Sequence, residues 1–145
     1  DLNTRAEAIR AVASCEEGRE ILTQSLREIE EREPRRSMIE AIVLKADEDL
    51  VRDFLSPIIL DSSLEGDERV FAITRLSFRL PFEDWAIEVL SQASHDIEPR
   101  VRISAAEMLS ESMGPEARPL IEHLLHDPAE DVRKATERLL DTSRE

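Results

Sequence analysis

Apolar residues recur along the chain at intervals of three and four positions, the spacing that places side chains on one face of an α-helix. In the middle of the chain this stripe is formed by Val51, Phe54, Leu55 and Ile58. Polar and charged residues fill the positions between, so each segment can bury one face and expose the other. The pattern predicts about nine helices, over residues 3–14, 17–32, 35–46, 48–61, 67–79, 83–94, 99–113, 116–126 and 129–141.

Several helix ends carry local signals. Asp127 stands just before the last predicted helix, where its carboxylate can accept hydrogen bonds from amides that have no partner in the first turn. Gly114 followed by Pro115 is typical of the end of one helix and the start of the next. Pro57 and Pro119 lie inside predicted helices, and we expect them to bend or interrupt these segments.

The sequence pattern itself returns with a period of 31 to 33 residues. Four positions of one copy recur 31 residues later, namely Asp96, Val101, Arg102 and Leu109 as Asp127, Val132, Arg133 and Leu140. Fainter copies contain Arg69 and, 64 positions earlier, Arg5, whereas the copy expected near residue 37 has Ser37 in place of the arginine. Paired helices at this period predict an all-α fold, an α-α superhelix of about four and a half helical hairpins. No Gly/Ser-rich or Pro-rich linker divides the chain, so we expect a single domain over 1–145, and the missing initiator Met is consistent with excision from a longer protein.

An Asp in the turn, then Val-Arg and small residues on the following helix, resembles the HEAT repeat. The closest likeness is to the short bacterial repeats, of about 30 residues, of bilin-lyase-like HEAT proteins. The resemblance covers the whole chain and is strongest over 96–141, whereas the signature residues of tetratricopeptide and ankyrin repeats are absent. In HEAT proteins the turn Asp and the helix Arg form a ladder between repeats. The resemblance implies that structural role for Asp96, Arg102, Asp127 and Arg133.

The composition narrows the partners that such a fold can have. Of 145 residues 41% are hydrophobic, but only 3% are aromatic and three are Gly, which disfavours strands and hairpins. Lys and Arg total 19 against 33 Asp and Glu, a net charge of −14 that repels phosphate and disfavours nucleic acid. No apolar run reaches the roughly 18 residues needed to span a bilayer, and Cys15 alone cannot form an internal disulfide. We therefore expect a cytoplasmic protein without a membrane or nucleic-acid partner.

No motif in the sequence predicts catalysis. His123 and His126 are three positions apart and could share a metal with Glu122 or Asp127, but no further convergent ligand is indicated, so we interpret both as surface histidines. The glycines are too far apart to form a phosphate-binding loop, and no Ser or Cys lies in a nucleophile motif. We expect no metal, no cofactor and no catalytic activity.

Stacked helical hairpins instead offer an extended concave surface, which we expect the second helix of each hairpin to line. Opposite their apolar stripes these helices carry mainly carboxylates, which predicts a basic or amphipathic segment of a partner protein as the ligand. Trp85 is the only Trp and either anchors this partner or packs between repeats. The candidate partner-binding residues are Glu28, Asp53, Asp84, Trp85, Glu88, Glu122 and His123.

The family resemblance permits an alternative to this binding module. The chain would then be a lyase or chaperone-type subunit that acts on a bilin or a similar prosthetic group. A coloured or cofactor-carrying partner would favour this alternative, and an ordinary signalling or assembly protein would favour the interaction module.

Overall fold

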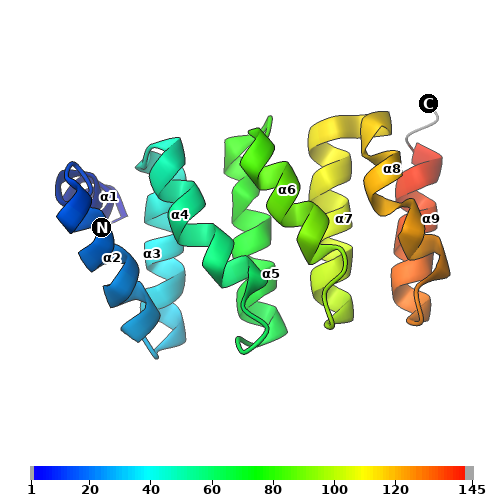
Figure 1. Ribbon diagram of the computed structural model, residues 1–145, viewed down its shortest axis with the longest axis horizontal. Coiled ribbons are helices and arrows are strands. Elements are labelled where there is room, and N and C mark those ends of the chain that lie inside the picture. The colour runs from blue at the N-terminus through cyan, green and yellow to red at the C-terminus, as the bar shows by residue number, and fades with distance from the viewer. Residues whose placement is uncertain (1, 143–145) are drawn as a thin grey trace.

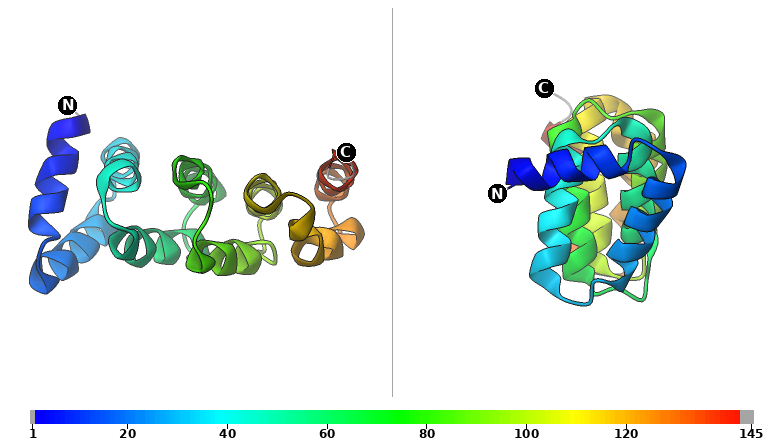
Figure 2. Two further views of the ribbon diagram at one scale, coloured as in Figure 1. Left: turned by 90° about the horizontal axis from the view of Figure 1, so that it is seen from above. Right: turned by 90° about the vertical axis from the view of Figure 1, so that its left-hand side faces the viewer.

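The computed structural model describes residues 2–142, and within them every side chain except those of residues 2, 3, 6, 26 and 27. This part of the chain is almost entirely helical and contains no strand. Its helices lie in two layers (Figure 1; Figure 2). The first layer contains α1 (Leu2–Val12), α3 (Arg32–Lys45), α5 (Gly66–Arg75), α7 (Pro99–Met113) and α9 (Glu130–Thr142). The second layer contains α2 (Glu16–Glu28), α4 (Glu48–Leu60), α6 (Asp84–Ala93) and α8 (Arg118–Ile121).

Successive helices alternate between the two layers, so the chain advances one helical hairpin at a time along the long axis of the molecule (Figure 1). In the first layer α3, α5, α7 and α9 run side by side, whereas α1 packs on α3 crosswise (Figure 2). The second helices also form a row, which is nearly straight over this length (Figure 2). Hollows on that side therefore arise between neighbouring helices rather than from the concave curvature that we expected.

The predicted fold class is confirmed: the chain is an all-α array of stacked helical hairpins. Helix α7 begins and ends at the predicted residues, and α4 runs through Pro57 without a break. The helix predicted over 116–126 was wrong, because the chain there forms the 3₁₀ segment η2 (Gly114–Ala117), the short α8 and the 3₁₀ segment η3 (Glu122–His126). Pro119 has no amide hydrogen, and it stands in the first turn of α8, where none is needed, so an α-helical turn begins here after the 3₁₀ segment. Another 3₁₀ segment, η1 (Leu76–Arg79), extends α5.

The two layers meet along one continuous core that extends from Ile9 to Leu140. The hairpins after the first contribute completely buried aliphatic side chains, among them Ile42, Leu55, Ile73, Leu90, Leu109 and Ile121. Burying one such side chain stabilises the fold by about 1.5–3 kcal/mol. Because each hairpin packs mainly on its neighbours, the core is a row of contacts, as in other solenoids.

The turns between helices are held by short-range contacts. The carboxylate of Asp47 accepts a hydrogen bond from the Leu50 amide at 2.9 Å at the start of α4. The Cys15 sulfur accepts one from the Gly18 amide at 3.4 Å at the start of α2. Gly114 follows α7 with a φ of 56°, a conformation that favours glycine. These local contacts fix the angle at which each helix leaves its neighbour.

Candidate functional site

Arginines on the first helices join each repeat to the turn of the next one. Arg102 of α7 donates from Nε and Nη2 to the two carboxylate oxygens of Asp127, each at 2.7 Å. Its Nη1 donates to the main-chain oxygen of Asp96, also at 2.7 Å. One repeat earlier, Arg69 of α5 holds both carboxylate oxygens of Asp96 and donates from Nε to the carbonyl of Ile59 at 3.0 Å. The structure thus brings Asp96, Arg102 and Asp127 into one ladder and adds Arg69 to it.

Arg133, the fourth residue of the expected ladder, makes only main-chain contacts. Its Nη1 donates to the main-chain oxygens of Asp127 at 2.5 Å and of Pro128 at 3.1 Å. Within residues 2–142 no carboxylate forms an ion pair with it. Arg133 therefore repeats the contact of Arg102 with the Asp96 carbonyl, and the partner of the Asp127 carboxylate is the arginine of the preceding repeat.

The pair between Arg102 and Asp127 is buried, with side-chain exposures of 10% and 4%. Burial alone would raise the pKa of Asp127. The hydrogen bonds from Arg102 and the Ala129 amide, together with the positive charges of Arg102 and Arg133, outweigh this effect. The pKa of Asp127 therefore lies below its ordinary value, and the carboxylate stays ionised and bound at neutral pH.

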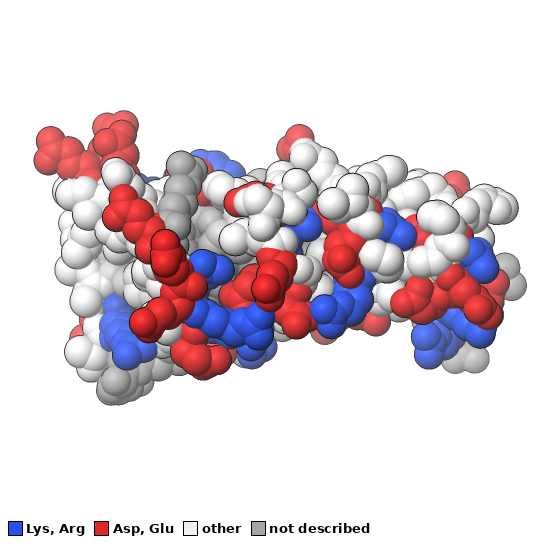
Figure 3. Space-filling model, turned by 90° about the horizontal axis from the view of Figure 1, so that it is seen from below, with Lys and Arg blue, Asp and Glu red and all other residues white. Residues whose placement is uncertain are grey.

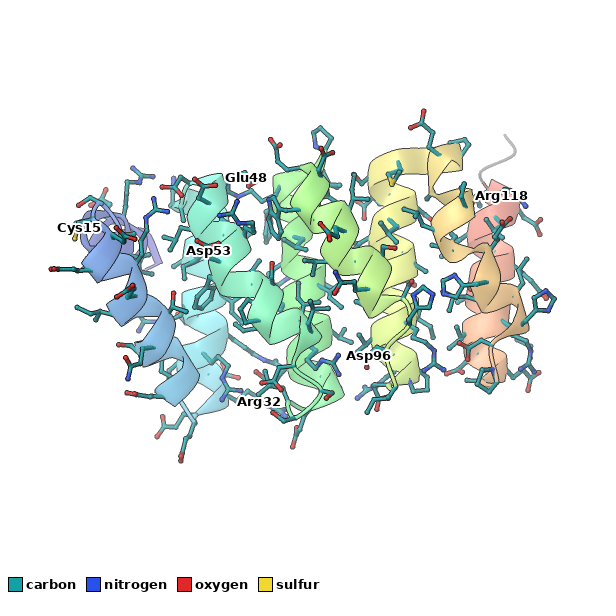
Figure 4. The ribbon with its side chains drawn as sticks, viewed as in Figure 1. Cys15, Arg32, Glu48, Asp53, Asp96 and Arg118 are labelled. Carbon is teal, nitrogen blue, oxygen red and sulfur yellow. The ribbon has the colours of Figure 1, made fainter. Side chains whose placement is uncertain are left out.

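The turn after α4 has the same aspartate geometry, at Asp61. One carboxylate oxygen of Asp61 accepts the amide hydrogen of Ser63 at 2.9 Å, as Asp96 and Asp127 each accept the amide two residues later at 2.9 Å. These turns lie on one edge of the array, where red and blue side chains intermingle (Figure 3), and Asp96 is labelled there in Figure 4. The repeat pattern did not indicate Asp61, because it lies 35 residues before Asp96 rather than 31 to 33.

The candidate partner-binding carboxylates lie exposed on the layer of second helices, which we call the second-helix face. Glu28 of α2 and Asp53 of α4 line one hollow between these two helices. Figure 4 shows Asp53 on the outer side of α4. The other members lie farther along the row, with Asp84 and Glu88 on α6 and Glu122 and His123 on η3, all exposed. The structure therefore places them in three successive patches rather than in one site.

Two basic residues of the second-helix face, Arg19 and Arg52, pair with nearby carboxylates. Arg19 of α2 pairs with Asp47 at 2.7 Å. Arg52 of α4 pairs with Asp53 at 2.9 Å and with Asp49 at 3.2 Å. The surface keeps an acidic excess, which attracts cationic groups and repels anionic ones.

Trp85 is only half exposed, because its ring packs against the core at the start of α6. Its indole Nε1 is buried and has no hydrogen-bond partner among the described residues. An aromatic anchor for a partner needs an open ring, whereas this ring is shared between core and surface. Packing between repeats therefore describes Trp85 better than a free anchor does.

Two histidines form a contact that the sequence did not indicate. The rings of His95 and His123 stack at a centroid distance of 4.1 Å and an angle of 5°. His95 Nδ1 lies 3.1 Å from the carbonyl of Ser91, and His123 Nε2 lies 3.3 Å from the carbonyl of Ser94. His126 is not part of this pair. In the described part of the chain no three His, Cys, Asp or Glu residues are grouped so as to hold a metal ion.

A cavity of about 410 Å³ lies beside the hollow between α2 and α4. Its walls are mostly apolar, but Arg35 of α3 and Asp61 also line it. The complete lining consists of Thr23, Arg35, Phe54, Pro57, Ile58, Asp61 and Leu64. Thr23 borders both spaces, so the cavity adjoins the acidic hollow. The residues come from three helices and a turn, and no sequence spacing could have grouped them.

Comparison with protein families matches residues 53–141 to HEAT repeats, which is more than half of the chain. The chain belongs to the HEAT-repeat family. The matched segment contains both arginine–aspartate pairs of the ladder, whereas α3, the first helix of the degenerate second repeat, precedes it. Comparisons with curated proteins and with solved structures found no match. Between residues 2 and 142, no helix of this HEAT array is both long and apolar enough to cross a membrane.

Proposed function

We propose that this protein is a non-catalytic interaction module whose second-helix face binds a basic or amphipathic segment of a partner protein. The observation that carries the proposal is the series of exposed carboxylates along the second layer, on α2, α4, α6 and η3, at Glu28, Asp53, Asp84, Glu88 and Glu122. HEAT arrays commonly mediate contacts between proteins, because stacked hairpins form long surfaces. Arg19 and Arg52 pair with Asp47 and Asp53, but carboxylates outnumber basic residues along the second helices, so the surface is acidic.

Such a surface acts more on the rate of association than on final affinity. Each exposed ion pair contributes only about 0–1 kcal/mol, but aligned charges steer an oppositely charged partner and repel competitors. We therefore expect binding that weakens as salt is added. The apolar side of an amphipathic segment has to supply the remaining affinity.

Affinity capture from cells of the native host tests the proposal. The wild type is compared with a double charge reversal on α6, Asp84→Lys with Glu88→Lys. The matched control reverses two exposed carboxylates four positions apart on a first helix, Glu107→Lys with Glu111→Lys on α7. We expect the α6 reversal to remove the specific partner and the α7 reversal to retain it. Equal capture by both double variants would place the binding surface elsewhere.

The nature of the captured partner decides between the two functions considered for the sequence. A protein without a prosthetic group supports the interaction module. A partner that carries a bilin or a similar pigment, detected by its visible absorption, would favour the lyase or chaperone-type subunit.

A further inference from the structure

Three turns of the array present an aspartate in the same way, but only two of these aspartates hold an arginine. Asp96 is bound by Arg69, and Asp127 is bound by Arg102. Among the side chains and amides that the structure describes, Asp61 accepts hydrogen bonds only from the Ser63 amide at 2.9 Å and the Ser63 hydroxyl at 2.6 Å, both at Oδ1. Its Oδ2 has no partner among the described residues. The second and third repeats therefore lack, at this position, the arginine–aspartate pair that connects the later repeats.

The arginine that could close this link is directed elsewhere. Arg35 of α3 donates from Nε and Nη2 to the carbonyl of Ile29, six residues earlier, as Arg102 and Arg133 each contact the carbonyl six residues before them. Its remaining nitrogen, Nη1, lies 3.8 Å from the buried carboxylate of Glu68. Arg35 thus occupies the ladder position without reaching Asp61.

The open link coincides with the cavity of about 410 Å³ described above. Asp61 lies on its lining beside the apolar side chains of Phe54, Pro57, Ile58 and Leu64. A space of this size is in the range of binding pockets for small groups, roughly 300–1,000 Å³. It is large enough for the methylene stem of a long side chain and a neighbouring apolar group.

We propose that this cavity receives an arginine side chain of the partner protein, whose guanidinium pairs with Asp61 while its methylene stem packs on Phe54, Pro57 and Ile58. The inference rests on the proposed function and names the anchor of the basic or amphipathic segment. The proposed pair with Asp61 would have the chemistry of the two internal pairs, in which the guanidinium of an arginine binds both carboxylate oxygens of a turn aspartate. The shared border at Thr23 lets the rest of the segment continue into the acidic hollow of Glu28 and Asp53.

Two further features of the turn favour a cation at Asp61. The hydrogen bonds from the Ser63 hydroxyl and amide, opposed in part by burial and aided by the charge of Arg69, lower the pKa of Asp61. The carboxylate is thus ionised in neutral solution. Nε and Nη2 of Arg35, across the cavity, both donate to the Ile29 carbonyl, so the fork of this arginine is not directed at Asp61.

An NMR titration of the complete chain tests this site without the partner. The probe is N-acetyl-L-arginine N-methylamide, and the matched probe is the citrulline analogue, which has nearly the same shape without the charge. We expect the arginine probe to cause saturable shifts of the Ser63 and Leu64 amide signals and to bind about tenfold more tightly than the citrulline probe, the effect of one charge-assisted pair. Equal binding of both probes, or shifts confined to the residues around Asp53, would overturn the inference.

Paired variants locate the charge that the probe recognises. Asp61→Asn keeps the acceptor for the Ser63 amide but removes the charge, and we expect it to weaken the arginine probe about tenfold. The control Asp49→Asn removes an exposed carboxylate in the first turn of α4, on the same layer, and is expected to leave the probe's affinity unchanged. An unaltered affinity for Asp61→Asn would overturn the site. If this variant fails to fold, the comparison of the two probes on the wild type decides the question.

Capture experiments separate this inference from the function on which it rests. A partner that is lost on charge reversal of α6 and also weakened by Asp61→Asn supports both. A partner that is lost on the α6 reversal but bound normally by Asp61→Asn would leave the proposed function intact and overturn the arginine site.

Discussion

Arg69 and Arg102 each connect their own first helix to the turn that follows the next second helix. Each also holds the chain before its own helix, Arg69 at the Ile59 carbonyl in the last turn of α4 and Arg102 at the Asp96 carbonyl in the turn before α7. Burying a charged pair costs desolvation energy that is about as large as the attraction between the two charges. Such a pair therefore fixes the orientation of neighbouring repeats more than it stabilises the fold. Removing one partner is different, because the other charge is left buried without compensation. The ladder therefore sets the angle between repeats and makes the fold sensitive to single changes at its aspartates.

We expect Asp127→Asn to destabilise the fold by about 3 kcal/mol, because Arg102 loses its buried charge partner. For a chain of this length that loss corresponds to a melting temperature roughly 6–12 °C lower. Asp96→Asn is expected to behave alike, since Arg69 is even more buried, at 1% exposure. The matched control is Asp61→Asn, an identical substitution in a turn of the same geometry that leaves no described arginine without its carboxylate partner. Similar melting temperatures for all three variants would contradict the structural role of the ladder.

The lowered pKa of Asp127 predicts a pH dependence with a definite sign. A folded-state pKa below the unfolded value of about 3.9 adds stability that is complete above that value and is lost as pH falls through the folded pKa. The difference in unfolding free energy between the wild type and Asp127→Asn should therefore be constant from pH 7 to about 5 and shrink below that. Urea denaturation at several pH values measures it. A difference that persists unchanged to pH 3 would show that the pKa is not lowered.

The contacts of single residues could be predicted from the sequence where the residues repeat at a fixed spacing, and were missed where they do not. Asp96 and Asp127 could be paired because 31 positions separate them within similar surroundings. Asp61 was missed because it lies five residues before the first residue of α5, whereas Asp96 lies three residues before that of α7, so Asp61 is out of register with the repeat. The stacking of His95 on His123 depends on how α6 packs beside η3, and no spacing along a single helix encodes such a contact.

The ends of helices were predicted best where a cap residue or a proline marks them in the sequence. The stripe and caps of α7 gave both of its ends, because Pro99 opens the helix and Gly114 closes it. Helix α3 begins three residues before its predicted start, since Pro34 is tolerated in a first turn, where no amide hydrogen is needed. A bend or an interruption was expected at both Pro57 and Pro119, but the structure has an interruption only around Pro119. A stripe of apolar positions fits α- and 3₁₀-helical turns about equally well over four or five residues.

The close approach of α1 and α2 predicts a selective effect of alanine at Gly18. A Cβ atom there would lie 1.7 Å from the main-chain oxygen of Val12, a backbone atom that cannot move without opening the turn. We expect Gly18→Ala to cost about 1–3 kcal/mol despite alanine's better helix propensity. Thermal melting followed by circular dichroism measures this loss.

Gly66 at the start of α5 provides the control. A Cβ atom there meets the flexible Glu98 side chain at 2.8 Å, which can swing aside. Gly66→Ala should therefore change stability by no more than about 0.5 kcal/mol. Equal effects of the two substitutions would contradict the packing of the first hairpin.

For the molecule as a whole, the repeat period was enough to predict the fold, because successive hairpins bury similar apolar stripes against one another. The interaction surface could be predicted from the sequence only in part. The acidic positions of the second helices follow from helix periodicity, but the grouping of Arg35, Asp61 and Phe54 around one cavity depends on the angles between helices. A near-straight row of helices concentrates binding in hollows between neighbours, where residues distant in sequence meet.

The central claim is that a partner protein binds the second-helix face, and site-specific photo-cross-linking tests it most directly. A photoreactive p-benzoylphenylalanine replaces Glu88 on α6 in one variant and Glu107 on α7 in the other, both at exposed positions. The variants are irradiated in cells of the native host, and cross-linked species are identified by mass spectrometry. The structure predicts a defined partner cross-linked at position 88 and none at position 107. A partner cross-linked at 107 but not at 88 would contradict the account.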